Sequence, residues 1–191
     1  NNGRHINAHG GGVLFHEGRY YWFGEHRPAK GFSTEVGVTC YSSPDLCNWT
    51  YEGVALPVSS EEGNDIEKGC IMERPKVIYN AKTGKFVMWF HLELKGEGYA
   101  AARAAVAVSD TPAGPYRFVR SCRVNPGVYP QNMTKAERKA KLDTKDYKTW
   151  WTPEWRRAVE QGLFAKRDLK SGQMSRDMTL FVDCLLYTSP S

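Results

Sequence analysis

Acidic and histidine side chains stand where short apolar runs of this sequence meet polar loops. The four candidates are Glu25 and His91, which each end an aromatic run, Glu73, which precedes an apolar run, and Asp177, which opens the last one. Carboxylates accept hydrogen bonds from sugar hydroxyls, and aromatic rings stack on sugar faces. Paired carboxylates also carry out the general acid–base steps of glycoside cleavage. These residue types therefore point to carbohydrate chemistry.

Each of the four residues also has a purely structural interpretation. Glu25 is compatible with an exposed loop acid, and His91 with a hydrogen-bonded histidine of the core. Glu73 and Asp177 each adjoin an arginine in the sequence, so both are compatible with simple ion pairs. Residue type alone leaves these alternatives open.

The elements that must position these residues form a pattern that is written twice. Gly12–His26 and Arg74–His91 each contain an apolar run, a polar turn with glycine and a second run ending in aromatics, which predicts a β-hairpin. A weaker pair of strand-like runs follows each hairpin. A four-stranded unit that repeats about every 65 residues is typical of a β-propeller, in which ligands bind at the end of the central channel. We therefore expect an all-β fold.

The repeat sets the expected organisation of the chain. We expect a partial propeller over residues 1–183, which divides into a first blade (12–56), a second blade (73–124), a helical insertion (125–172) and the first strand of a third blade (173–183). Residues 184–191 are interpreted as the remnant of a sequencing adapter, so the chain is expected to be a piece of a longer protein. A partial propeller is expected to be unstable and inactive alone.

The insertion carries helix signals. Thr134–Glu137 has the spacing of a capping box, and Thr152 with Pro153 indicates a second helix that runs to Gln161. Three tryptophans of this region fit either a sugar platform or a helix-packing core, and the core is the favoured interpretation. They are Trp150, Trp151 and Trp155.

Composition excludes several function classes. Charged residues make up 25% of the chain and aromatic residues 13%, which argues against a disordered chain. Much of the net charge of +5 lies in 135–157, where acids alternate with bases, so a solvated face is favoured over a nucleic-acid surface. No apolar stretch has the length of a membrane span. Cysteine spacing fits no zinc or redox motif; no cofactor is expected, and nothing supports a structural calcium ion.

The segment His9–Gly12 reads His-Gly-Gly-Gly, as does the oxyanion loop of lipases and esterases. Such enzymes also need a Gly-x-Ser-x-Gly nucleophile turn, which this sequence lacks. The sequence therefore argues against an esterase.

Several blocks together resemble glycoside hydrolase family 43, and most closely its exo-β-1,3-galactanase branch. The blocks are INAHGGGVL with YYWFGE, ERPKVIYN with KFVMWFH, and SRDMTLFVD, in this order. The resemblance implies a five-bladed propeller that cleaves O-glycosyl bonds with inversion of the anomeric centre. It also implies an oligo- or polysaccharide substrate, namely β-1,3-galactan or arabinogalactan side chains.

The resemblance also assigns residues. Glu73 is implied as the catalytic carboxylate that tunes the general acid, and the general acid itself lies beyond Asp183. Substrate contacts are implied at Glu25, Tyr99 and Asp177, with His9 as a further contact and His91 as a candidate from its position. Most of the family has a base aspartate near the start of the chain. Here that segment reads Ile-Asn-Ala-His, a departure shared by the galactanase branch.

Two other functions stay open at this stage. One is a different specificity of the same family, such as arabinofuranosidase or xylosidase. The other is a carbohydrate-binding propeller without catalysis. The complete protein is expected to be secreted, periplasmic or attached to the cell surface, with no nucleic-acid partner.

Overall fold

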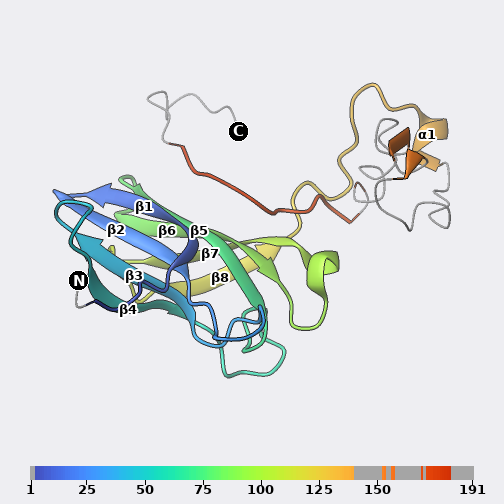
Figure 1. Ribbon diagram of the computed structural model, residues 1–191. Coiled ribbons are helices and arrows are strands. Elements are labelled where there is room, and N and C mark those ends of the chain that lie inside the picture. Colours follow the sequence, from blue (N-terminus) through green and yellow to red (C-terminus); the bar gives the residue numbers. More distant parts are fainter. Residues whose placement is uncertain (1–2, 140–151, 154–155, 158–168, 170, 182–191) are drawn as a thin grey trace. The chain divides into compact units, whose positions relative to one another are not determined.

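The computed structural model describes residues 3–139, 152–153, 156–157, 169 and 171–181. These residues form two antiparallel four-stranded sheets, in the orders β1-β2-β3-β4 and β5-β6-β7-β8 (Figure 1). The strands of the first sheet are β1 (His9–His16), β2 (Arg19–Glu25), β3 (Gly37–Ser43) and β4 (Thr50–Pro57). Those of the second are β5 (Ile71–Asn80), β6 (Lys85–Glu93), β7 (Arg103–Ser109) and β8 (Arg117–Cys122), with the short 3₁₀ helix η1 (Gly98–Ala101) between β6 and β7.

Both predicted hairpins are confirmed. In the first, the turn consists of Glu17 and Gly18, which both have positive φ, at 48° and 80°. A two-residue turn of this kind matches the right-handed twist of the strands that it joins. The hairpins β1–β2 and β5–β6 stand first in the strand orders of the two sheets. We call them the inner hairpins, because β1 lies against β5.

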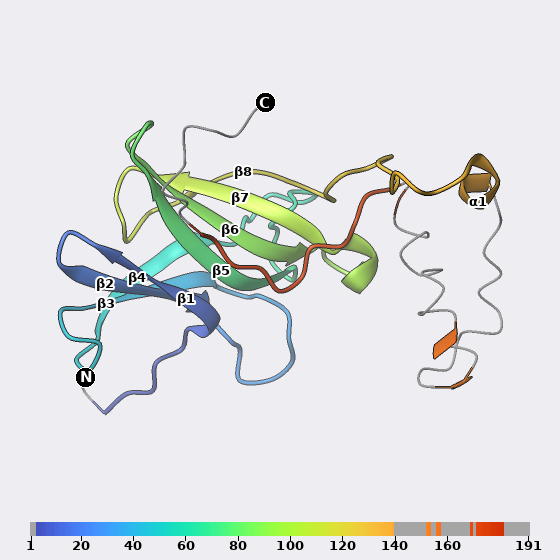
Figure 2. The same ribbon diagram turned by 90° about the horizontal axis from the view of Figure 1, so that it is seen from above.

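The two sheets pack face to face over one apolar core, as Figure 2 shows. Aromatic, aliphatic and sulfur-containing side chains fill its centre, and among the largest that are fully buried are Phe23, Phe90, Leu56, Met72 and Met88. Burial of this kind contributes roughly 2–3 kcal/mol for each large side chain. The core therefore fixes β1 and β5 as neighbours, which brings their ends together.

The sheets meet through faces that are not equivalent. Val13 and Val77 hold matching positions of the two hairpins, yet Val77 packs against the core while Val13 is 52% exposed on the far side of its sheet. Leu14, one residue later, is the side chain that packs against the core from β1. The front of one unit thus covers the back of the next, which is how propeller blades stack. The expected all-β partial propeller is confirmed.

The three consecutive glycines of β1 are explained by crowding. A Cβ atom on Gly11 would lie 1.5 Å from the carbonyl oxygen of Phe23, and one on Gly12 would lie 2.6 Å from the side chain of Lys76. Lys76 also donates a 2.9 Å hydrogen bond from its Nζ to the carbonyl oxygen of Gly11. Glycine at these two positions therefore leaves the space that β2 and β5 occupy.

The opening strand expected at 173–183 is not formed among the described residues. Gln173 makes an isolated bridge with Val124, and residues 178–181 have no strand pairing. The first strand of a hairpin gains its hydrogen bonds from its partner, and no described residue offers these positions a partner edge. Residues 182–183 lie outside the described part of the chain.

Residues Arg123–Met174 form a compact unit of their own. Its described helix, α1 (Lys135–Lys139), starts directly after Thr134, whose carbonyl oxygen accepts a 3.0 Å hydrogen bond from the Arg138 amide. The helix expected at 153–161 and the three tryptophans fall largely or wholly outside the described residues. No helix in the described part is long and apolar enough to span a membrane.

Candidate active site

The inner hairpins of both sheets carry the same irregularity at the same place. After Gly12 pairs with Phe23, the register skips one residue of β1, and His9 then pairs with Glu25. In the second sheet, a matching skip in β5 brings Glu73 opposite His91. Each is a one-residue β-bulge, a feature that re-aims side chains and is frequent beside active sites.

The bulges contain backbone of left-handed conformation. Gly10 has a φ of 57° and Arg74, at the matching position of β5, has a φ of 56°. For an arginine this conformation is strained by about 1 kcal/mol or more, whereas glycine adopts it freely. A Cβ atom on Gly10 would also lie 2.9 Å from the guanidinium of Arg74. The missing side chain in one bulge therefore makes room for the arginine of the other.

Arg27 joins the two bulges. Its Nε lies 2.9 Å from Oε2 of Glu25, and its Nη2 lies 2.9 Å from Oε1 of Glu73. The same Nε is 3.3 Å from Nδ1 of His9. One guanidinium thus connects three of the six predicted site residues, although it follows the end of β2 and was not itself predicted.

Glu25 is completely buried, and its pKa is raised to about 7. Loss of solvent is the largest cause, and the nearby Glu73 carboxylate raises the pKa further. The positive charges of Arg27 and Arg74 act in the opposite direction. Its Oε1 has no hydrogen-bond partner among the described residues. The interpretation of Glu25 as an exposed loop acid is therefore wrong.

Glu73 keeps access to solvent. About 26% of its side chain is exposed, and it lines a cavity of about 190 Å³ together with Arg74, His91, Arg176 and Asp177. Its ion pair is made with Arg27, while the adjacent Arg74 pairs with Asp177 at 2.7 Å. An accessible carboxylate that a cation holds in place is suited to act on a bound molecule.

The remaining predicted residues are placed differently. His91 is buried between the carbonyl oxygen of Ser175, which its Nδ1 meets, and Oε1 of Glu93, 3.0 Å from its Nε2. Asp177 has 84% of its side chain exposed. His9 is 55% exposed. Tyr99 belongs to η1, and its side chain lies outside what the structure describes.

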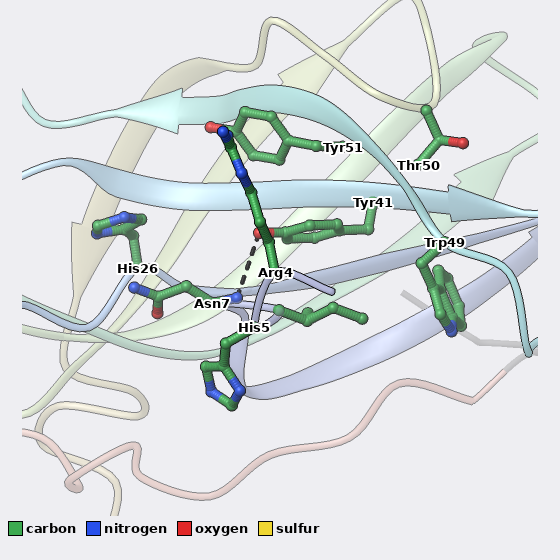
Figure 3. Close-up of a pocket in the computed structure, with 9 residues that line it drawn as sticks. Arg4, His5, Asn7, His26, Tyr41, Trp49, Thr50 and Tyr51 are labelled. Atoms are coloured by element: carbon green, nitrogen blue, oxygen red, sulfur yellow. Dashed lines mark hydrogen bonds between the residues drawn. The ribbon is translucent and has the colours of Figure 1, made fainter. Parts of the chain in front are cut away.

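A separate hollow of about 590 Å³ lies at the N-terminal segment and the strands β3 and β4 (Figure 3). None of the six predicted site residues lines it. Its lining is Arg4, His5, Ile6, Asn7, His26, Tyr41, Trp49, Thr50 and Tyr51.

Sequence reasoning missed Arg27 and Asn7. The side-chain oxygen of Asn7 accepts a 2.8 Å hydrogen bond from the Arg27 amide, and its Nδ2 donates a 2.9 Å bond to the Arg27 carbonyl. The only signal in the sequence was the position of Arg27, two residues beyond an acid that ends a strand.

Comparison with known proteins found no matching family model and no matching curated protein, but several solved structures are similar. A family 43 β-1,3-galactosidase solved with galactodeoxynojirimycin is 76% identical over 94% of this chain and 52% of its own, with a TM-score of 0.82. An exo-β-1,3-galactanase from Clostridium thermocellum is 46% identical over 66% of this chain and 27% of its own, with a TM-score of 0.58. A Phanerochaete chrysosporium exo-β-1,3-galactanase solved with β-1,3-galactotriose is 40% identical over 62% of this chain and 27% of its own, with a TM-score of 0.57.

The chain spans about half the length of the first of these structures and about a quarter of the other two. The level of identity, over nearly all of this chain in the first case, is far above what a shared fold alone requires. Together with the stacked four-stranded sheets, it shows that the chain belongs to glycoside hydrolase family 43.

Proposed function

We propose that this chain forms half of the catalytic propeller of an exo-acting hydrolase that cleaves β-1,3-galactan or arabinogalactan side chains with inversion. The three similar structures are, by name, a β-1,3-galactosidase and two exo-β-1,3-galactanases. The observation that carries the proposal is the carboxylate Glu73, which is accessible and held by Arg27 at the end of the inner strands.

Glu73 is the proposed catalytic residue of this half. Its carboxylate lies at the bulge of β5, where the strand turns toward the cavity that Arg176 and Asp177 also line. A negative charge beside a carboxylic acid disfavours ionisation of that acid. Glu73 thereby keeps a neighbouring general acid protonated until that acid gives its proton to the leaving oxygen. Inverting enzymes hold their acid and base carboxyl groups about 6.5–9.5 Å apart, which leaves room for water.

His9 and Asp177 are the proposed sugar contacts with the most exposed side chains. Because the Nε of Arg27 donates to Nδ1 of His9, a neutral imidazole carries its proton on Nε2 and can donate it to a hydroxyl. Asp177 offers an exposed carboxylate that accepts from sugar hydroxyls. Tyr99 and His91 complete the proposed set of sugar contacts. The buried Glu25 acts indirectly, through its ion pair with Arg27.

The test uses a hybrid in which residues 3–181 of this chain replace the matching part of the 76% identical galactosidase. The substrate is β-1,3-galactobiose, and the readouts are the sugar released and the anomer first formed. We expect galactose to be released with inversion. In the hybrid, Glu73→Gln should lower kcat by about 10²–10⁴-fold, the range of a positioned acid or base.

The matched control is Glu35→Gln, because Glu35 is a half-exposed carboxylate paired with Lys68 on the surface. It should keep the activity of the parent hybrid. Unchanged turnover of Glu73→Gln overturns the catalytic assignment. Release of arabinose or xylose from arabinogalactan in place of galactose identifies a different specificity. Binding of galactan without any release identifies a carbohydrate-binding propeller.

A further inference from the structure

The guanidinium of Arg27 contacts the two carboxylates through different nitrogen atoms. Nε meets Oε2 of the buried Glu25 and Nη2 meets Oε1 of the accessible Glu73, both at 2.9 Å. The Cζ atom of the same group lies over the ring of Phe32, 5.3 Å from the ring centroid. A rigid planar fork can hold two carboxylates in fixed directions, whereas the ammonium of lysine is a point charge.

The backbone of Arg27 is fixed as firmly as its side chain. Both polar groups of its peptide, the amide and the carbonyl, bind the side chain of Asn7. Asn7 is in turn held by the hydroxyl of Tyr41, which accepts from its amide at 3.2 Å (Figure 3), and by the hydroxyl of Thr39, which donates to its carbonyl at 2.6 Å. The segment that contains Asn7 thus clamps the backbone of Arg27.

We propose that Arg27 is a positioning residue of the hydrolase, anchored by Asn7 and Glu25, and that it holds the carboxylate of Glu73 in the direction that catalysis requires. The inference rests on the proposed function. It assigns Glu25 an indirect role, which agrees with the complete burial of that side chain.

The contacts of Arg27 with Glu25 and Glu73 should affect how kcat/KM depends on pH. The charged and titratable groups around the guanidinium are His9 from β1, Glu25 at the end of β2, and Glu73 and Arg74 from β5. Without Arg27, two neighbouring carboxylates would lose their shared cation, and one of them would take up a proton more readily. Uptake of a proton by the two carboxylates together therefore begins at a higher pH, and the acid limb of the kcat/KM profile moves upward.

The experiment compares Arg27→Met and Arg27→Lys in the hybrid with the parent hybrid. We expect Arg27→Met to lower kcat by about 10²-fold with little change in KM, the scale of a misplaced catalytic group. Its acid limb should move up by about one pH unit or more. Arg27→Lys should keep the acid limb of the parent, because the charge remains, and recover only part of kcat, because one ammonium cannot contact both carboxylates.

Arg19→Met is the matched control. Arg19 stands at the opposite end of β2, where its Nε donates a 3.0 Å hydrogen bond to Ser42, and it touches none of the site residues. It should leave kcat and the pH profile unchanged. An Arg27→Met hybrid with the kcat and acid limb of the parent overturns the proposal. So does a loss of kcat with an unmoved acid limb that Arg27→Lys does not relieve, since this is the result of a purely structural role.

Two further measurements keep the outcomes separable. If Arg27→Met does not fold, Arg27→Gln carries the same kcat and pH comparison, because it also removes the positive charge. If the parent hybrid releases no sugar, the proposed function fails, and the anchoring of Arg27 by the buried Glu25 is judged by stability alone. Arg27→Met should then destabilise the fold more at pH 8 than at pH 5, and Glu25→Gln in the same protein should remove this pH dependence. A loss of stability that is equal at both pH values overturns the claim.

Discussion

Glu25 and His91 occupy the same position in the two sheets, each opposite the first residue of a one-residue bulge and each almost without solvent contact. Their surroundings differ, because the two sheets turn non-equivalent faces toward each other. Glu25 points to the interface of the sheets and meets Arg27, whereas His91 is covered by Ser175 and Glu93. Equivalent positions of the two sheets thus hold different buried polar groups, a carboxyl group in the first sheet and an imidazole in the second.

The first prediction concerns the stability of the fold against pH. The pKa of Glu25 is about 7 in the folded state against its ordinary value of 4.5, so the folded state binds more protons between these values. Its contribution to stability is complete below pH 4.5 and is lost as the pH rises toward 7. In the hybrid, the free energy of unfolding of Glu25→Gln relative to the parent should rise by roughly 2 kcal/mol as the pH is raised from 4.5 to 8. The full difference between the two pKa values corresponds to ~3 kcal/mol, and screening by solvent lowers it.

Urea denaturation of both proteins at several pH values measures this difference. Other titrating groups are common to both proteins and largely cancel. A constant difference across the range would show that Glu25 ionises in the folded state as it does in water.

The second prediction concerns the glycines of β1. Gly11→Ala places a methyl group against the backbone of Phe23 and Gly24, which cannot move without breaking the hairpin, so the cost should be at least ~3 kcal/mol. Gly84→Ala is the control, because nothing lies within 4 Å of its Cβ position and only its φ of 66° opposes the substitution. That penalty is about 1 kcal/mol. Comparable unfolding free energies for the two variants would contradict the packing argument.

The hairpins and the ends of their strands could be predicted from the sequence, because turns and apolar runs are local signals. Glu73 was found in this way, at the point where an apolar strand begins. The burial of Glu25 and His91 could not be predicted, since both faces of a stacked sheet are apolar and alternation no longer separates inside from outside. The part played by Arg27 depends on a contact across 46 residues, which no local pattern encodes.

The third prediction tests whether His91 has a structural role. His91→Leu removes the partner of Glu93, which is itself only 5% exposed, and a buried charge without a partner costs about 3 kcal/mol. Glu93→Leu should cost a comparable amount, and the double variant should cost about 1–3 kcal/mol less than the sum of the two. Strict additivity of the three unfolding free energies would show that the two side chains do not interact.

The fourth prediction separates binding from stability at Asp177. Its ion pair with Arg74 is made by an aspartate that is 84% exposed, and such pairs contribute about 0–1 kcal/mol. Asp177→Asn in the hybrid should therefore unfold within ~0.5 kcal/mol of the parent. If Asp177 accepts hydrogen bonds from a sugar hydroxyl equally in the ground and transition states, the substitution should raise KM about 10-fold and leave kcat nearly unchanged.

Asp110→Asn is the matched control, because Asp110 is a similarly exposed aspartate paired with Lys85 at the far end of the second hairpin. A KM equal to that of the control would exclude Asp177 from substrate binding, and a fall in kcat at constant KM would move it from binding to the chemical step.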